Sequence, residues 1–135
     1  MIGAMALRVG IDLASVAAVQ ASVEAHADRY LSRVYTDHEL QECQTAAGLD
    51  PERLASRFAV KEAAMKVLRP ADSDAIPWTA IATRRGATGV VEIELTGPAA
   101  EAAAEAGLGE LAASITHEAE FAAAVVIAET SEDGR

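Results

Sequence analysis

The chain has 135 residues, of which 51% are hydrophobic but only 4% aromatic, and its formal charge is −10. This length fits one domain of about 100–150 residues, and the negative charge argues against general binding to nucleic acids. No run of about 18 residues is apolar and free of charge, so we expect no membrane span, and residues 1–6 are too short for a signal peptide. We therefore expect a cytoplasmic location. Because the protein is acidic, an anionic substrate would need a local basic pocket or a bound cation.

The N-terminal part predicts a strand followed by a helix. Residues 8–12 form a short apolar run that contains a glycine and ends at Asp12, which is typical of a strand. Valines then recur at spacings of three and four residues, which predicts one buried helix face, with the helix ending near residues 26–28.

Thr36 and Glu39 have the spacing of a capping box, in which a threonine and a glutamate satisfy the free backbone donors of a new helix. This predicts a second helix over residues 37–47. Gly48 is expected to end it, because glycine tolerates the left-handed backbone of a helix end.

The longest predicted helix begins at Asp50-Pro51-Glu52. The aspartate is a good cap, and proline at the first helical position loses no hydrogen bond. The glutamate lies at the positive end of the helix dipole. No breaker intervenes before Arg69, and Pro70 ends the helix.

The remaining pattern predicts an α+β fold in a single domain over residues 1–129, with residues 130–135 as a frayed, charged tail. The remaining predicted elements, in chain order, are a hairpin of strands 80–85 and 90–96, an alanine-rich helix from Gly97-Pro98 to Gly107, and an antiparallel pair 114–117 and 121–128 joined by the turn 118–120.

The segment from Arg57 to Lys66 lies inside the long helix and concentrates charge. Phe58, Glu62 and Lys66 are four residues apart and therefore share one helix face. One interpretation is an exposed surface on which Glu62 and Lys66 form an ordinary helix ion pair worth about 0.2–0.5 kcal/mol. The other is a functional cluster, and the spacing alone does not decide between them.

The same segment resembles the signature of the phosphopantetheinyl transferase family: an aromatic residue, a small residue, any residue, Lys-Glu, a small residue, two residues and Lys. Two further motifs of the family match, Gly10-Ile11-Asp12 and Ser114-Ile115-Thr116-His117. The three motifs occur in the family's order and cover almost the whole chain. The resemblance implies the family's fold, in which an antiparallel sheet packs against a long central helix.

The resemblance also implies an activity of the holo-acyl-carrier-protein synthase type. Such an enzyme transfers the 4'-phosphopantetheine group of coenzyme A to a serine of an apo acyl carrier protein and releases 3',5'-ADP, in fatty-acid or polyketide biosynthesis. Family members are homotrimers with active sites at the subunit interfaces, so a homotrimer is expected here. A catalytically silent, coenzyme-A-binding oligomer is the alternative, and a magnesium phosphohydrolase is a third possibility.

By resemblance, Asp12 and Glu62 are the two carboxylates that hold Mg²⁺, a cation that prefers oxygen ligands and substrate phosphates. Lys66 matches the lysine that contacts the coenzyme A phosphate, and Glu62, Lys66 and His117 are the expected catalytic residues. Taken alone, an aspartate after a strand is more typical of a helix cap. Glu39 resembles a glutamate of the family, but its capping role is sufficient to explain it.

Further substrate contacts are expected from Arg57 and Lys61, which form a basic row beside the signature, and from Gly89, Thr116 and His117. Without the family, His117 would be interpreted as a satisfied core histidine, since Ile115 lies on the same face of its strand. With it, the histidine lies at the coenzyme A site, where it binds the terminal phosphate or assists proton transfer.

Two departures from the family pattern are visible. Val90 and Val91 follow Gly89 where the family has a basic residue and a proline, which puts side-chain contacts to the nucleotide from this loop in doubt. The first helix carries no lysine or arginine where the family grips an acidic carrier protein. The carrier is therefore expected to be less acidic, to dock through Arg29 and Arg33, or to be tethered to the enzyme.

Overall fold

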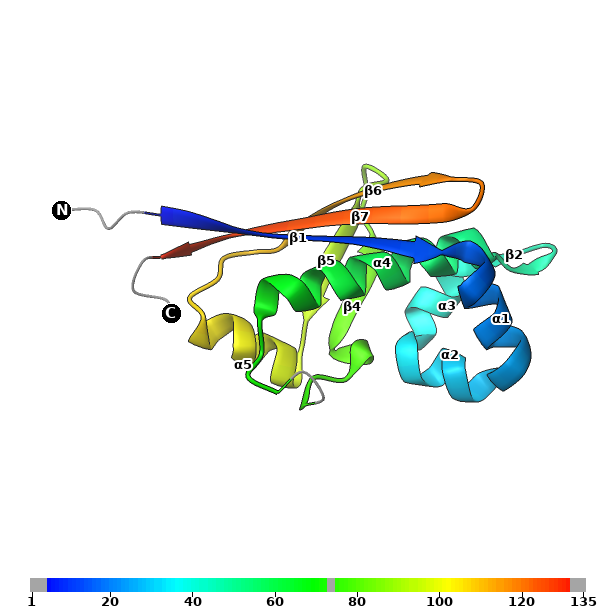
Figure 1. Cartoon of the computed structure of the whole chain (residues 1–135), viewed down its shortest axis with the longest axis horizontal. Helices are drawn as coiled ribbons and strands as arrows, with labels where there is room; N and C mark the ends of the chain where they lie inside the picture. Colours follow the sequence, from blue (N-terminus) through cyan, green and yellow to red (C-terminus); the bar gives the residue numbers. More distant parts are fainter. Residues whose placement is uncertain (1–4, 73–74, 132–135) are drawn as a thin grey trace.

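The computed structural model describes residues 5–72 and 75–131, and it has the predicted α+β architecture. A five-stranded antiparallel sheet, in the order β1-β7-β6-β5-β4, lies against the long helix α4, with α1, α2 and α3 at one end and α5 at the other (Figure 1). The elements in chain order are β1 (Met5–Ser15), α1 (Val16–His26), α2 (Asp28–Val34), α3 (Asp37–Cys43), β2 (Gln44–Thr45), β3 (Gly48–Leu49), α4 (Pro51–Leu68), η2 (Trp78–Ala80), β4 (Ile81–Arg85), β5 (Val91–Leu95), α5 (Gly97–Glu105), β6 (Ala112–Glu118) and β7 (Phe121–Ser131).

The ends of α4 lie where the sequence predicts them. The carboxylate of Asp50 accepts a hydrogen bond from the backbone N–H of Glu52 at 3.0 Å, and Pro51 occupies the first turn. At the other end Arg69 adopts a left-handed backbone with φ 48°, and Pro70 follows. The resulting helix is 18 residues long and is the central element of the fold.

Two predicted boundaries in the N-terminal half are wrong. β1 is longer than the predicted strand, because its alternation of apolar residues continues on both sides of residues 8–12. The helix that begins after Thr36 ends at Cys43, and Gly48 instead starts the second strand of a small hairpin, with φ 107°. The short helix α2 was not predicted.

The predicted frayed tail is also wrong where the structure describes it. Thr130 and Ser131 belong to β7, and the hydroxyl of Thr130 donates a hydrogen bond to the carbonyl oxygen of Ala106 at 2.8 Å. Residues 132–135 of the predicted tail lie outside the described residues.

Small residues are frequent where α4 packs on the sheet. Four alanines of α4 are completely buried, and α4 packs against β1 and against β7, whose buried positions are mostly alanine. The buried alanines are Ala55, Ala59, Ala63 and Ala64 on α4 and Ala122, Ala124 and Ala128 on β7. Alanine brings backbones close together but interlocks little, whereas Leu54, Val60, Val67 and Leu68 of the same helix supply larger buried side chains.

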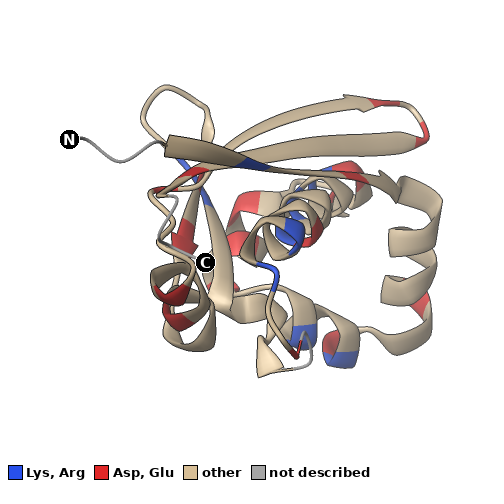
Figure 2. Ribbon diagram, turned by 60° about the vertical axis from the view of Figure 1, so that its left-hand side comes forward, with Lys and Arg blue, Asp and Glu red and all other residues tan. Residues whose placement is uncertain are grey.

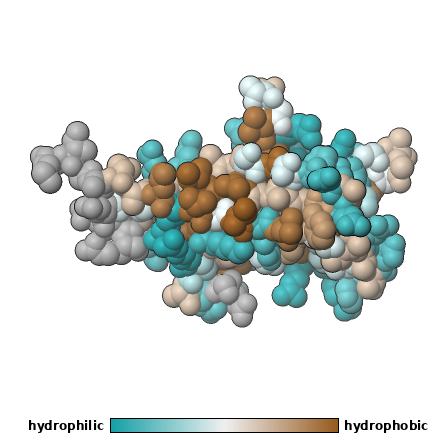
Figure 3. All heavy atoms as spheres, turned by 45° about the horizontal axis from the view of Figure 1, so that its top comes forward, coloured by the Kyte–Doolittle hydropathy of each residue, from teal (hydrophilic) through white to brown (hydrophobic). Residues whose placement is uncertain are grey.

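The opposite face of the sheet is apolar and uncovered in the single chain. Five alternate residues of β1 are exposed, and Phe121 and Val125 of β7 lie beside them. The residues of β1 are Met5, Leu7, Val9, Ile11 and Leu13, which we call the β1 stripe. Figure 3 shows hydrophobic side chains gathered on this face. No helix within the described ranges is both long enough and apolar enough to cross a membrane.

Candidate active site

The crossing of β1 over α4 brings two predicted metal ligands together. Gly10 makes the crossing possible, because a Cβ atom at this position would overlap the carbonyl oxygen of Ala63 and lie 3.2 Å from the Cβ atom of Lys66. Asp12 follows two residues later and therefore points to the same side of the strand as Gly10. Asp12 contacts Glu62, the residue that directly precedes Ala63 on α4.

Asp12 and Glu62 lie close enough to interact directly. Burial, then the negative charge of Asp12 and a hydrogen bond between the two side chains, raise the pKa of Glu62 above its ordinary value, while the positive charge of Lys66 opposes this shift. The Nζ atom of Lys66 donates to the carbonyl oxygen of Ile11 at 2.7 Å and lies 3.6 Å from Oδ1 of Asp12. Two carboxylates held together with one flanking cation are typical of a site for a divalent cation.

Two alternative interpretations of these residues do not fit. Ser15, not Asp12, caps α1, because its hydroxyl oxygen accepts a hydrogen bond from the backbone N–H of Ala18. Lys66 forms its ion pair with Asp12 on β1, so the lysine does not simply form a helix pair with Glu62.

A pocket of about 290 Å³ opens beside the carboxylate pair. Its wall includes Ser15 and Ala18 at the start of α1, and the rings of Tyr30 and Phe58. Among residues 5–72 and 75–131 no group of three or more His, Cys, Asp or Glu side chains could hold a metal ion. The pair alone nevertheless suits Mg²⁺, which commonly takes one or two carboxylates from the protein and its other ligands from water and substrate phosphates.

A second pocket, of about 450 Å³, unites three of the predicted substrate-binding residues, Arg57, Gly89 and His117, and we call it the cationic pocket after the arginines in its lining. Arg53 and Arg85 also line it and were not singled out from the sequence. Arg53 lies one helical turn before Arg57, and this spacing was the available signal. Asp50 and Glu52 line the pocket as well, so the three arginines leave only a small excess of positive charge in its lining for an anionic substrate.

His117 is not a core residue. Its side chain is 53% exposed, and Nδ1 lies 3.1 Å from a carboxylate oxygen of Glu52 at the start of α4. Thr116, its neighbour on β6, points to the opposite face of the sheet, because side chains alternate along a strand. Thr116 borders a hollow of about 560 Å³ beside the β6–β7 turn, which Leu13, Phe121 and His117 also line.

Lys61 lies inside the protein and not in a substrate pocket. It is completely buried, and its ammonium group donates hydrogen bonds to Glu39 at 2.8 Å and to the carbonyl oxygens of Ile81 and Trp78 at 2.8 and 3.1 Å. With no exposed surface and three donors already used, it has nothing left to offer a phosphate. The predicted substrate contact of Lys61 is therefore wrong.

Arg57 is nearly buried but still lines the cationic pocket. Its Nη1 atom donates to Glu42 at 2.8 Å and to the hydroxyl of Thr83 at 3.2 Å. Burial acts to raise the pKa of Glu42, but hydrogen bonds from Arg57 and from the backbone N–H of Arg85 hold it below its ordinary value. The arginine is thus fixed in one orientation by its own partners.

The carboxylate pair and the cationic pocket lie on opposite sides of α4. At about 100° per residue, the helix positions that line the cationic pocket point roughly 170° away from Phe58 and Glu62. The helix positions in the cationic pocket are Glu52, Arg53, Ser56 and Arg57. One chain therefore does not gather all the predicted site residues around a single pocket.

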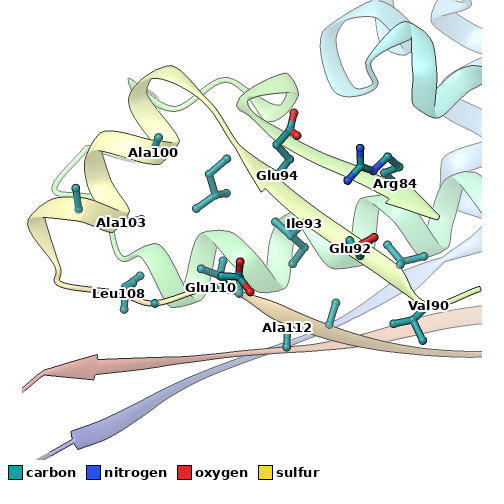
Figure 4. A pocket seen from close by; sticks show the side chains of 16 residues that line it. Arg84, Val90, Glu92, Ile93, Glu94, Ala100, Ala103, Leu108, Glu110 and Ala112 are labelled. Carbon is teal, nitrogen blue, oxygen red and sulfur yellow. The ribbon is translucent and has the colours of Figure 1, made fainter. Parts of the chain in front are cut away.

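A hollow of about 730 Å³ between β5, α5 and the start of β6 holds none of the predicted residues (Figure 4). It exists because β5 pairs with β6 only where Glu92 lies opposite Ala112. Alanine, valine and leucine form much of its lining, and Glu92, Glu94 and Glu110 carry negative charge at it. An anion would be repelled there, so this hollow is not a candidate for the same substrate.

A sequence model described as the 4'-phosphopantetheinyl transferase superfamily matches residues 8–126. The chain belongs to this superfamily. A curated relative from Koribacter versatilis, a holo-[acyl-carrier-protein] synthase, is 35% identical over 125 residues, which cover 93% of this chain and 99% of the relative.

Solved structures of this superfamily have the same fold as the chain. The holo-[acyl-carrier-protein] synthase of Helicobacter pylori in complex with coenzyme A matches with a TM-score of 0.77 and 27% identity, covering 90% of this chain and 99% of that one. The ACPS–CoA complex of Chronobacterium ammoniagenes matches with a TM-score of 0.78 and 30% identity, covering 91% and 96%. The predicted α+β domain and family are confirmed.

Proposed function

We propose that the protein transfers the 4'-phosphopantetheine group of coenzyme A to a serine of an apo acyl carrier protein and releases 3',5'-ADP. The observation that carries this proposal is the contact between Asp12 and Glu62 beside Lys66, in a chain of this superfamily. The relatives are named for this activity, and two structural neighbours were solved with coenzyme A. Fatty-acid or polyketide biosynthesis in the cytoplasm is the proposed setting.

We infer that Asp12 and Glu62 are the protein ligands of Mg²⁺. Their oxygen donors, and the raised pKa of Glu62 that a nearby divalent cation would reverse, fit that ion. When bound, Mg²⁺ neutralises the charge of the substrate pyrophosphate and polarises the phosphoryl group. A carboxylate pair with so few protein ligands leaves room for substrate oxygens.

The chain's own cations have separate proposed tasks. Lys66 is half-exposed and sits beside the carboxylate pair, where its ammonium group stabilises charge on the transferred phosphoryl group. Arg57, Gly89 and His117 line the cationic pocket and are the proposed contacts for the nucleotide end of coenzyme A, while Thr116 is a proposed polar contact in the hollow that it shares with His117. The protein provides orientation and electrostatic stabilisation, while the carrier serine supplies the nucleophile.

A homotrimer with active sites between subunits is the proposed assembly. The β1 stripe leaves a continuous apolar surface that a neighbouring subunit would cover. In a single chain the carboxylate pair and the cationic pocket lie on opposite sides of α4. In the proposed trimer, the carboxylate pair of one subunit lies close to the cationic pocket of the next. Ile11→Glu places a charge in the stripe and should shift the protein to monomers in sedimentation experiments, with loss of transfer.

The proposed carrier differs from a strongly acidic one. Helix α1, which follows β1, carries one acidic residue, Glu24, and no lysine or arginine (Figure 2). Arg29 and Arg33 on the neighbouring helix α2 are both exposed, and they are the proposed docking cations. Electrostatic steering of the carrier is therefore weak, and its association rate should depend little on salt.

The experiment that tests the proposal is incubation of the protein with coenzyme A, Mg²⁺ and several apo carrier proteins, followed by mass spectrometry of each carrier. A pantetheinyl mass increase on at least one carrier is expected, and omission of Mg²⁺ should abolish it. Tight binding of coenzyme A with no increase on any carrier would instead support the catalytically silent oligomer. Release of pantetheine phosphate without a carrier would indicate a phosphohydrolase.

A further inference from the structure

Glu39 and Lys61 form a buried ion pair whose hydrogen-bonding capacity is used inside the chain. Both side chains are completely buried, and Nζ of Lys61 lies 2.8 Å from Oε1 of Glu39. The same oxygen accepts from the backbone N–H of Thr36 at 2.8 Å, and the other oxygen accepts from the backbone N–H of Thr83 at 2.8 Å. With the carbonyl contacts of Lys61, this pair ties α4 to α3, η2 and β4.

Thr83 extends the pair to the cationic pocket. Its hydroxyl donates to Glu39 and accepts from Nη1 of Arg57 at 3.2 Å. One chain of hydrogen bonds therefore runs from Arg57, which lines the cationic pocket, to Lys61, which directly precedes Glu62 on α4. The network therefore lies between the cationic pocket and the Asp12–Glu62 carboxylate pair, and Glu39 and Lys61 are exposed at neither.

The hydrogen bonds of this network add to the packing of α4, where buried alanines on α4 and β7 interlock little although Val60, Val67 and other large side chains of α4 are buried too. Side-chain tips lie about 5–6 Å from a helix axis, so a rotation of roughly 20° moves the carboxylate of Glu62 by about 2 Å. A displacement of about 1 Å at a catalytic group can cost 100-fold in rate. Directional hydrogen bonds resist rotation in a way that smooth apolar contact does not.

We propose that the buried Glu39–Lys61 pair is a positioning element that fixes the rotation of α4. It thereby aims Glu62 toward Asp12, and through Thr83 it holds Arg57 in the cationic pocket. Lys61 acts through its neighbours and does not touch the substrate. This inference rests on the proposed function for its kinetic test, but it also makes a structural claim that can be tested separately.

The test compares Lys61→Met, the double variant E39Q/K61M and a control, Val67→Ala. The double variant leaves no charge unpaired in the core, so it should fold more stably than Lys61→Met. Val67 is a buried residue of α4 outside the network, so its truncation lowers stability without removing a network contact. Each protein is assayed below its melting temperature for kcat and for the Mg²⁺ concentration that gives half-maximal transfer.

The expected result is that both Lys61 variants lose at least about 10-fold in kcat and need at least about 5-fold more Mg²⁺, while Val67→Ala stays within about 2-fold of the wild type. Thr83→Val keeps the Glu39–Lys61 ion pair but removes the hydroxyl that connects Glu39 to Arg57. It should raise KM for coenzyme A about 5-fold with kcat and the Mg²⁺ requirement unchanged. A folded E39Q/K61M protein with wild-type kcat and Mg²⁺ requirement would overturn the proposal.

Crystal structures give the second readout, which needs no activity. When the structures are superposed on the sheet, α4 of E39Q/K61M should be displaced relative to α4 of the wild type. If the double variant does not fold, the side chain of Arg57 in Thr83→Val should be displaced instead. An unchanged orientation of these groups overturns the positioning role even if transfer occurs. A wild-type protein that transfers to no carrier counts against the proposed function instead, and the displacement of α4 then decides the positioning role alone.

Discussion

Lys61 and Glu62 are neighbours on α4, yet they lie in opposite chemical environments. Lys61 is completely buried and shares its charge with Glu39 and two carbonyl groups. Glu62 is half-buried beside Asp12, a second negative charge, and its pKa is raised by burial and by that neighbour. Lys61 has every partner it needs inside the protein, while among the described residues the carboxylates of Glu62 and Asp12 have only Lys66 to compensate their charge.

This difference distinguishes charged side chains that stabilise the fold from charged side chains that are available to bind a ligand. A buried ion pair with complete hydrogen bonding has no capacity left for a substrate. Two carboxylates pressed together repel each other, and a bound divalent cation would relieve that repulsion. Proximity in the sequence motif therefore says less about a residue's task than its partners in the fold.

The largest expected effect comes from removing the charge of Glu62. Glu62→Gln should lower transfer at least about 1,000-fold, because one of two metal ligands loses its charge, while the protein remains folded. Asp12→Asn should behave in the same way. Mass spectrometry of the carrier gives the rate, and circular dichroism gives the stability. Full activity in either variant would contradict the metal assignment.

The approach of β1 to α4 provides the next largest effect. Gly10→Ala should destabilise the protein by about 3 kcal/mol, because the added Cβ overlaps the carbonyl oxygen of Ala63 and pushes the strand away. Transfer should fall as well, since Asp12 moves with the strand. Chemical denaturation measures the free energy of unfolding.

Gly48→Ala is the matched control for that experiment. Gly48 has φ 107°, but a Cβ atom added there would meet nothing within 4 Å. The substitution should therefore cost about 1–2 kcal/mol through backbone strain and leave transfer unchanged. Equal losses of activity in the two variants would show that the close approach at Gly10 has no special role.

Local signals were enough to predict most of the fold. Asp50-Pro51 and Pro70 bound α4 as expected, and the final strand pair lies where the sequence placed it. The β1 stripe was an available signal for a longer first strand, because its apolar residues alternate from Met5 to Leu13. Helix α2 and the hairpin of β2 and β3 are only seven and two residues per element, too short for periodicity to identify.

The site was less predictable because it depends on contacts between distant residues. Lysine is almost never fully buried unless paired, so nothing in the sequence pattern indicated that Lys61 lies inside. Its partner Glu39 is 22 residues away, and the capping box explains that glutamate locally without indicating its second bond. The family signature indicated which residues lie near the site, but not which of them are exposed.

A smaller effect is expected from removing the helix cap beside the Glu39–Lys61 ion pair. Thr36→Ala removes the hydroxyl that accepts from the backbone N–H of Glu39 and should destabilise the protein by about 1 kcal/mol. The backbone N–H of Thr36 remains, so the carboxylate of Glu39 keeps its four donors and transfer should stay within about 2-fold of the wild type. Thermal unfolding and the carrier assay check the two expectations. A large loss of transfer would mean that the cap itself controls the site.

The smallest expected effect is on the pH dependence of stability. Because the pKa of Glu62 is raised in the folded protein, the folded state binds more protons than the unfolded state between the ordinary glutamate pKa and the raised value. The contribution of Glu62 to stability is therefore greatest below the ordinary pKa and is lost as the pH rises through the folded value. Glu62→Gln should remove this dependence, so the difference in melting temperature between wild type and variant should change in favour of the variant as the pH rises.

Added Mg²⁺ with coenzyme A favours the ionised carboxylate and should restore stability to the wild type at neutral pH but not to the variant. A pH-independent difference between the two proteins would mean that Asp12 and Glu62 do not repel each other, and the contrast with Lys61 would lose its electrostatic basis.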